Sequence, residues 1–417
     1  MQASTLTALF LLFLTTNVVV QIWLAQRQIR HVRANRDRVP GEFADRISLA
    51  SHQRAADYTT ERTRLRIAEG VFDAAILLLL TLGGVLNEIQ QAFDGWFASM
   101  LMRDVALIAS VSLLLGAIHM PFSVYRQFKL EQKFGFNRMT PKLFLADVLK
   151  GLLVASVLGL PLLALILWLM QGAGAAWWLW AWASWAGFNF VVMLIFPTWI
   201  APLFNRFTPL QDTALKDRIQ ALARRCDFAI NGLFVMDGSK RSAHGNAYFT
   251  GFGKSRRIVF FDTLLAKLTP TEIEAVLAHE LGHFKHKHIV KRLAVSLFSS
   301  LLLFALLGWV MQQGWFYQGL GVEPLSGGNN GMALLLFFLA LPVFTFLLTP
   351  VTSWLSRRDE FEADRFAASQ SQAGDLISAL VKLFNDNAAT LTPDPVHSAF
   401  YDSHPPATIR IQALAGA

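Results

Sequence analysis

The chain has 417 residues, of which 54% are hydrophobic and only 16% are charged, and it contains 34 Phe and 12 Trp. This composition excludes an ordinary soluble enzyme of the same length and indicates a protein that crosses a membrane several times. The net charge of +8 reflects basic loops on one side of the membrane, and we expect no nucleic-acid partner, because no soluble segment combines basic and aromatic residues. The single cysteine, Cys226, excludes an internal disulfide and a cysteine-rich zinc site.

Seven apolar stretches are long enough to cross the lipid bilayer. The first, Thr5 to Leu24, has no basic segment before it and no small-residue cleavage site, so we interpret it as a retained helix and not as a signal peptide. Pro342 and Pro350 interrupt the last stretch. The predicted spans cover residues 5–24, 70–88, 104–124, 145–171, 175–202, 290–312 and 332–354. Residues 25–69 are polar and arginine-rich, which indicates a solvated loop with helical pieces.

Two charged segments interrupt the apolar pattern and divide the chain into four parts. These are spans one to five, a first soluble segment, spans six and seven, and a C-terminal soluble segment, at residues 1–202, 203–289, 290–354 and 355–417. The first soluble segment is predicted to contain a helix and three short strands, at residues 214–225, 232–236, 246–250 and 257–261, with a turn at Gly251 and Gly253 between the last two strands. The fold class is therefore a mainly α, integral-membrane protein with a small α+β soluble domain.

Basic residues set the predicted orientation in the membrane. Segments 25–69, 125–143 and 203–289 are rich in Arg and Lys, whereas the loops between the other spans contain only Arg103. The positive-inside rule then places the N-terminus outside and both soluble segments in the cytoplasm, where they can meet and form one domain. The corresponding membrane is the inner membrane if the source is bacterial and the endoplasmic reticulum if it is eukaryotic.

A His-Glu-x-x-His sequence lies in the first soluble segment, at His279, Glu280 and His283. Residues four apart share one face of a helix, so both imidazoles can bind one metal ion. Glu280 then lies beside that ion and can take a proton from a water bound to it. Thr269-Pro270-Thr271-Glu272 has the residues of a helix start, which supports a helical setting. The alternative, two unrelated histidines at the end of an amphipathic helix, is the weaker interpretation.

A catalytic zinc site commonly has three protein ligands and one open position, so the histidine pair needs a third ligand. Glu360 in the C-terminal segment is the candidate, and Asp364 follows it one helical turn later on the same face. We expect Glu360 to bind the metal and Asp364 to accept a hydrogen bond from the non-ligating nitrogen of His279. Alone, this stretch would be better interpreted as a salt-bridged helix face among arginines, but the histidine pair favours the ligand interpretation.

Other histidines and acids near these motifs receive simpler interpretations. His286 and His288 lie among lysines and are interpreted as a solvated or interfacial helix end. Glu362 points away from the face of Glu360 and is expected to be solvated or paired with an arginine. Among the histidines in loops, His404 in Tyr401-Asp-Ser-His-Pro-Pro406 is the one that we suspect of a functional role.

Several motifs together resemble one family, the type I CaaX prenyl proteases, which are integral-membrane zinc metalloendopeptidases of the gluzincin type. The matching stretches, in the family's order and with its seven spans, are Asn246-Ala-Tyr-Phe-Thr-Gly-Phe252, His279-Glu-Leu-Gly-His283, Ser356-Arg-Arg-Asp-Glu-Phe-Glu-Ala-Asp364 and Ser403-His-Pro-Pro406 with Arg410. The resemblance therefore covers most of the chain and is more specific than the His-Glu-x-x-His sequence alone.

This resemblance implies a set of roles and an architecture. It implies one Zn²⁺ per chain, held by His279, His283 and Glu360, with Glu280 as the general base. Asn246 and Ala247 would lie on an edge strand that pairs with the substrate backbone, and His404 and Arg410 would lie near the scissile bond, where His404 could stabilise the developing oxyanion. The family fold encloses a large water-filled chamber between its seven helices, with the zinc at its cytoplasmic end.

The leading hypothesis is a membrane-embedded zinc metalloendopeptidase that acts on a peptide or protein substrate at the lipid bilayer. One possible substrate is a prenylated CaaX peptide, which would lose its last three residues. The other is a misfolded or signal-peptide-like membrane protein, cut in quality control. A hypothesis of another class is a transporter or membrane scaffold with a structural metal, which would need a closed site of four ligands. Glu280, an acid beside the metal that is not a ligand, argues against it.

Overall fold

The computed structural model describes residues 1–250, 257–325 and 328–416 and is mainly helical. Within these residues, six helices are long and apolar enough to cross a membrane, and the bent pair α2 and α3 brings the number to seven if it is counted as one span. The helices of this part are α1 Ala3–Ala34, α2 Leu49–Leu80, α3 Val85–Asp94, α4 Met100–Tyr125, α5 Pro141–Gly172, α6 Trp177–Ile195, α10 His288–Val310, α11 Gly314–Gly319 and α12 Asn330–Thr345. The predicted class, a multi-pass membrane protein with a small soluble domain, is confirmed.

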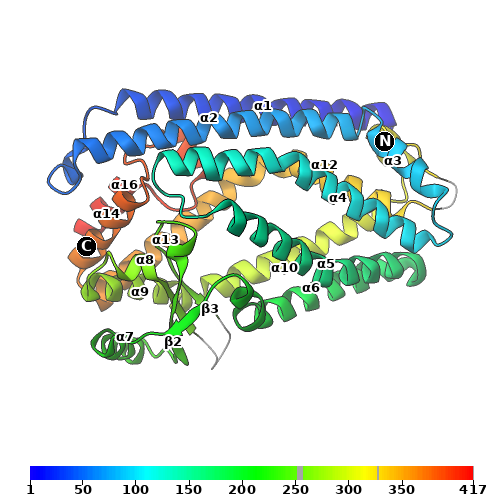
Figure 1. The fold of residues 1–417 in the computed structure, drawn as a ribbon. Helices are drawn as coiled ribbons and strands as arrows, with labels where there is room; N and C mark the ends of the chain where they lie inside the picture. The colour runs from blue at the N-terminus through cyan, green and yellow to red at the C-terminus, as the bar shows by residue number, and fades with distance from the viewer. Residues whose placement is uncertain (251–256, 326–327, 417) are drawn as a thin grey trace.

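The arginine-rich region at residues 25–69, predicted as a solvated loop with helical pieces, is mostly helix. α1 continues to Ala34 and α2 begins at Leu49, so helix occupies most of the region. Ser48 caps α2 by accepting a hydrogen bond from the backbone N–H of Ser51, at 3.2 Å. α1 and α2 pack side by side along their length (Figure 1). The polar residues therefore extend two membrane helices beyond their apolar parts, because packing between the helices stabilises them there.

The second predicted span, residues 70–88, contains a bend that the sequence pattern did not predict. α2 ends at Leu80, α3 begins at Val85, and their axes differ by 48°. Gly84 at the start of α3 has a φ of +80°, a conformation that glycine adopts without steric cost. Because the apolar pattern continues through the bend, hydropathy predicts a single span, whereas the structure has two helix segments.

The soluble part combines the two charged segments around one apolar core. Its sheet has the order β1-β2-β4-β3, so β3 is an edge strand among the described residues. The strands are β1 Phe207–Pro209, β2 Gly232–Met236, β3 Ala247–Thr250 and β4 Arg257–Phe261. The remaining helices are α7 Thr213–Arg225, α8 Asp262–Leu265, α9 Pro270–Lys285, α13 Thr349–Gln370, α14 Ala373–Asp386, α15 Pro395–Tyr401 and α16 Ala407–Ala415. β1 was not predicted, and the turn expected at Gly251 and Gly253 lies outside the described residues.

Two helices of this core, α9 and α13, continue directly into membrane helices. α9 begins with a complete capping box, in which Thr269 and Glu272 each bond the other's backbone N–H, and it is separated from α10 only by a turn at Lys287. α13 follows α12 after the short turn Phe346–Leu348, with Pro350 in its first turn. The orientation of both helices is therefore fixed by the membrane bundle and by the soluble core.

α9 and α13 approach each other most closely at Gly282. A Cβ atom built on Gly282 would lie 2.9 Å from the Cα of Ala363 and 3.1 Å from its carbonyl oxygen. These are backbone atoms that cannot rotate away, so only glycine fits here without moving a helix. This contact is next to the site residues of both helices: His279 and His283 on α9, and Glu360 on α13.

We therefore expect Gly282→Ala to push α9 away from α13. The free energy of unfolding should fall by about 1–3 kcal/mol, as for other overpacked contacts, and bound metal should be lost. Thermal unfolding and metal analysis of the purified protein measure both effects. The matched control is Gly374→Ala, since Gly374 lies in α14 with open space around its Cβ position. Equal behaviour of the two variants would contradict the packing argument.

Candidate active site

His279, His283 and Glu360 converge where α9 meets α13. One ligand atom from each residue lies within 4.8 Å of the others. The Nε2 atoms of His279 and His283 lie 3.4 Å and 3.3 Å from different carboxylate oxygens of Glu360. Two imidazoles and one carboxylate form a donor set that suits zinc and leaves a fourth position open. Glu360 is only 2% exposed, so its carboxylate is held among these groups and away from bulk water.

Asp364 lies behind His279, as the spacing from Glu360 predicts. Its Oδ1 is 2.8 Å from the Nδ1 of His279, so Nδ1–H can donate to it and leave Nε2 free for a metal. Arg410 donates two hydrogen bonds to the same carboxylate, at 2.8 and 2.6 Å. Burial alone would lower the pKa of His279, but the carboxylates of Asp364 and Glu360 outweigh it and raise that pKa to about 9.

His288 forms a similar support behind His283, although the sequence suggested a solvated residue. It is 1% exposed, and its Nδ1 lies 3.0 Å from the Nδ1 of His283. Its Nε2 lies 3.1 Å from a carboxylate oxygen of Glu362. If His283 donates from Nδ1, His288 accepts there and donates from Nε2 to Glu362, which satisfies every ring nitrogen but the Nε2 of His283. The expectation that His288 belongs to a solvated or interfacial helix end was therefore wrong, whereas Glu362 also forms the predicted pair with an arginine, Arg358, at 3.5 Å.

The reason for that error is local backbone geometry. Lys287 has a φ of 56°, in the left-handed region, and separates α9 from α10. Continued as one helix, the sequence would point His288 away from His283, as periodicity suggests. The turn instead brings His288 back toward the end of α9. A lysine in the left-handed region is uncommon and has no strong sequence signal.

Glu280 and His404 lie on the open side of the cluster. Glu280 is half-buried and makes no hydrogen bond or ion pair within the described part of the chain. His404 is 64% exposed at its side chain, and its Nδ1 lies 2.7 Å from the Oε2 atom of Glu360. That oxygen is buried, yet no donor among the described residues makes a hydrogen bond to it. A buried carboxylate oxygen without a hydrogen bond fits a position that binds a cation.

Of the three residues predicted to contact the substrate, Asn246 and Ala247 lie at the edge strand, whereas Arg410 is buried. Ala247 begins the edge strand β3, where it pairs with Phe260 of β4, and Asn246 directly precedes it. Arg410 is 6% exposed and is held by Asp364, with its Nη1 3.9 Å from Glu360. It therefore lies behind the ligand residues, while the edge strand has one side unpaired among the described residues.

Comparison with known proteins identifies the family. Residues 28–206 match the sequence profile described as CAAX prenyl protease N-terminal, five membrane helices, and residues 209–417 match peptidase family M48. The chain belongs to peptidase family M48. It is a membrane-embedded metalloendopeptidase, and its resemblance to the type I CaaX prenyl proteases is confirmed. Membership favours the peptidase interpretation over a transporter or scaffold.

Individual M48 relatives match nearly the whole chain. The CAAX prenyl protease 1 homolog of Mus musculus is 31% identical, over 98% of this chain and 94% of the mouse protein. CAAX prenyl protease 1 of Saccharomyces cerevisiae is 32% identical, over 94% of this chain and 91% of the yeast protein. The crystal structure of S. mikatae Ste24p has the same fold, with a TM-score of 0.90 and 30% identity over 98% of this chain and 99% of that one.

The support behind His283 yields a prediction that does not depend on turnover. His288→Phe removes the acceptor for the Nδ1–H of His283, so we expect zinc affinity to fall about ten- to a hundredfold. His288→Asn, which keeps an acceptor near Nδ1, should recover part of that loss. Competition titration with a chromophoric chelator measures it. His286→Gln is the control, since His286 is half-buried and 4.0 Å from Glu362. A His288→Phe variant as tight as this control would contradict the assigned hydrogen bonds.

Proposed function

We propose that this M48 peptidase holds one zinc ion through His279, His283 and Glu360 and uses it to hydrolyse peptide bonds. The observation that carries the proposal is the convergence of two imidazoles and one buried carboxylate from separate helices. Each of the two ligand histidines is accompanied by a polar partner: Asp364 behind His279 and His288 behind His283. Such partners fix the tautomers that present Nε2 to a metal.

The remaining polar residues divide the work of hydrolysis. When bound, zinc supplies Lewis acidity toward the attacking water and the peptide carbonyl. Glu280, half-buried and without a partner among the described residues, accepts the proton of the water and passes it to the leaving amine. His404, exposed beside Glu360, donates a hydrogen bond to the oxyanion that develops on the carbonyl oxygen. Arg410 acts indirectly, by holding Asp364 in place behind His279.

Substrate would bind along the edge strand. β3 pairs with β4 on one side only within the described sheet, so an extended peptide can add to its free side at Asn246 and Ala247. We infer a prenylated CaaX peptide as the substrate class, because the relatives from mouse and yeast are both called CAAX prenyl proteases. Cleavage would release the last three residues.

The active site is proposed to face the cytoplasm. Residues 25–69, 125–143 and 203–289 contain most of the basic residues outside the apolar helices. The polar ends of α1 and α2 lie at the same end of the molecule as α9, α14 and the C-terminus (Figure 1). This distribution follows the positive-inside rule.

The catalytic role of Glu280 can be tested directly. Glu280→Gln keeps the size of the side chain but cannot accept the proton, so kcat should fall at least about a hundredfold. Zinc content should remain at one ion per chain, since Glu280 is not a ligand. Metal analysis and single-turnover cleavage of a fluorogenic peptide give the two readouts. Loss of zinc together with activity would contradict the assignment as general base.

The substrate class is tested with a farnesylated CaaX peptide and the same peptide without the lipid, each with and without a chelator. A CaaX protease should cleave the farnesylated peptide with the higher kcat/KM, and the chelator should abolish both reactions. Equal turnover of the two peptides would instead favour the quality-control function.

A further inference from the structure

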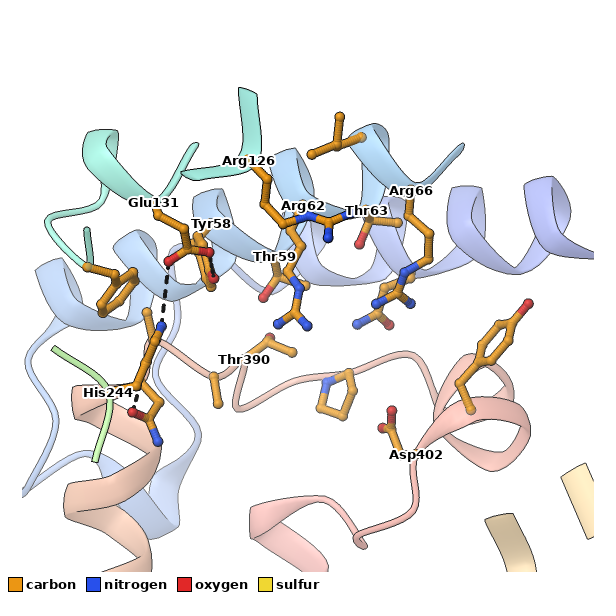
Figure 2. Close-up of a pocket in the computed structure, with 18 of the residues that line it drawn as sticks. Tyr58, Thr59, Arg62, Thr63, Arg66, Arg126, Glu131, His244, Thr390 and Asp402 are labelled. Atoms are coloured by element: carbon orange, nitrogen blue, oxygen red, sulfur yellow. Dashed lines mark hydrogen bonds and ion pairs between the residues drawn. The ribbon is translucent and has the colours of Figure 1, made fainter. Parts of the chain in front are cut away.

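A large cavity lies beside the candidate active site, with a volume of about 1020 Å³. Pockets for small ligands have volumes of roughly 300–1,000 Å³, so this one can hold several residues of a peptide. α2 forms one wall, the helical segment Arg126–Glu131 that follows α4 and the residues after it form a second, and the segments 387–393 and 401–406 form a third. Figure 2 shows these walls facing one another.

The cavity adjoins the candidate metal centre. Ser403 and His404 belong to its lining, and the Nδ1 of His404 lies 2.7 Å from Glu360. A peptide whose scissile bond reaches the cluster can therefore extend part of its chain into this cavity. The charged residues of the cavity walls determine which part of a peptide can bind there.

Most charged groups in the walls are already paired. Arg126 forms an ion pair with Glu69, and Arg241 binds Asp147 through two hydrogen bonds of 2.8 and 2.9 Å. Glu131 accepts a hydrogen bond from Tyr58 at 2.6 Å and lies 3.5 Å from His244. These pairs neutralise one another and leave little net charge.

Arg62 and Arg66 are the exceptions. They make no ion pair and no hydrogen bond within residues 1–250, 257–325 and 328–416. Both are exposed, and Figure 2 shows both guanidiniums extending from α2 toward the segments that carry Thr390 and Asp402. Residues four apart on a helix are neighbours, so two like charges here destabilise α2 unless an anion lies between them.

The surroundings of this pair are electropositive. Burial, together with the charge of Arg66, lowers the pKa of His397 in the same wall to about 4. Asp402 is the one carboxylate of the wall that is not part of the pairs above, and burial raises its pKa. The hydroxyls of Thr59, Thr63 and Thr390 lie on the walls around the guanidiniums and add hydrogen-bonding groups. The cavity thus has the character of an anion site.

We propose that Arg62 and Arg66 bind the free C-terminal carboxylate of the peptide substrate. This assignment rests on the proposed function, since it places the cleaved end of the chain in the cavity beside His404. Arginine forks match the two oxygens of a carboxylate, and such charge-assisted hydrogen bonds are the strong ones. A carboxylate at the end of a short peptide can reach the cavity from the metal centre, because His404 lines the cavity and lies beside Glu360.

Binding of the terminal carboxylate would determine how far from the chain end the substrate is cleaved. A peptide anchored by its terminal carboxylate places a bond a fixed number of residues away at the metal centre. An internal segment of a misfolded membrane protein carries no such carboxylate and would gain nothing from the pair. The two arginines would therefore make the enzyme selective for chain ends.

The test compares a farnesylated CaaX peptide that ends in a free carboxylate with the same peptide as a C-terminal carboxamide, using the full-length, zinc-loaded enzyme. The wild-type enzyme should cleave the acid with a kcat/KM about ten- to a hundredfold higher than the amide. Arg62→Gln and Arg66→Gln should lower kcat/KM for the acid by a similar factor and leave the amide unchanged. Arg64→Gln is the matched control, because Arg64 lies on α2 but lines a different surface depression.

The outcomes separate the hypotheses. Equal cleavage of acid and amide by the wild-type enzyme overturns the carboxylate site, and so does an equal loss on both peptides in the arginine variants, which would indicate a role in folding or lipid binding. Unchanged turnover of the amide shows that each variant is folded. If the wild-type enzyme cleaves neither peptide but cleaves an unrelated unfolded protein, the proposed CaaX function fails, and with it the basis of this site.

Discussion

The close approach of α9 and α13 at Gly282 is the constraint on which the candidate active site depends. The two imidazoles belong to one helix and the carboxylate to the other, so the distance between the helix axes sets the distance between the ligand atoms. A side chain at the contact would separate the helices by more than a metal site tolerates, since zinc–ligand distances vary by only about 0.2 Å. Backbone packing therefore determines the geometry of the metal centre before any ligand contributes.

The ligand residues also connect the membrane bundle to the soluble core. α9 leads into α10 and α13 continues from α12, so movement of either membrane helix would be transmitted to the cluster. Asp364 with Arg410, and His288 with Glu362, then fix the orientation of the imidazoles from two different sides. His288 is the first residue of α10, which makes the support of His283 a direct link to that membrane helix. The candidate metal centre is therefore held both by the apolar core that the two soluble segments share and by the membrane helices.

Sequence patterns predicted those features that depend on spacing along a single element. The histidine pair, the Glu360 and Asp364 pair, three of the four strands and the apolar spans all follow from helical or strand periodicity. Features that depend on a local change of backbone direction were missed: the bend between α2 and α3 at Gly84, and the turn at Lys287 that buries His288. The helical extension of α1 and α2 into residues 25–69 depends on packing between the two helices, which no single stretch reveals. The pair Arg62 and Arg66 could be found only in the structure, because its lack of partners is a property of the surrounding walls.

The most direct test of the account is a crystal structure of the zinc-loaded protein with anomalous diffraction recorded on both sides of the zinc absorption edge. We expect one anomalous peak per chain, within about 2.0–2.2 Å of the Nε2 atoms of His279 and His283 and of a Glu360 carboxylate oxygen. A peak at another position, or a peak on the histidines with the Glu360 carboxylate beyond bonding distance, would contradict it.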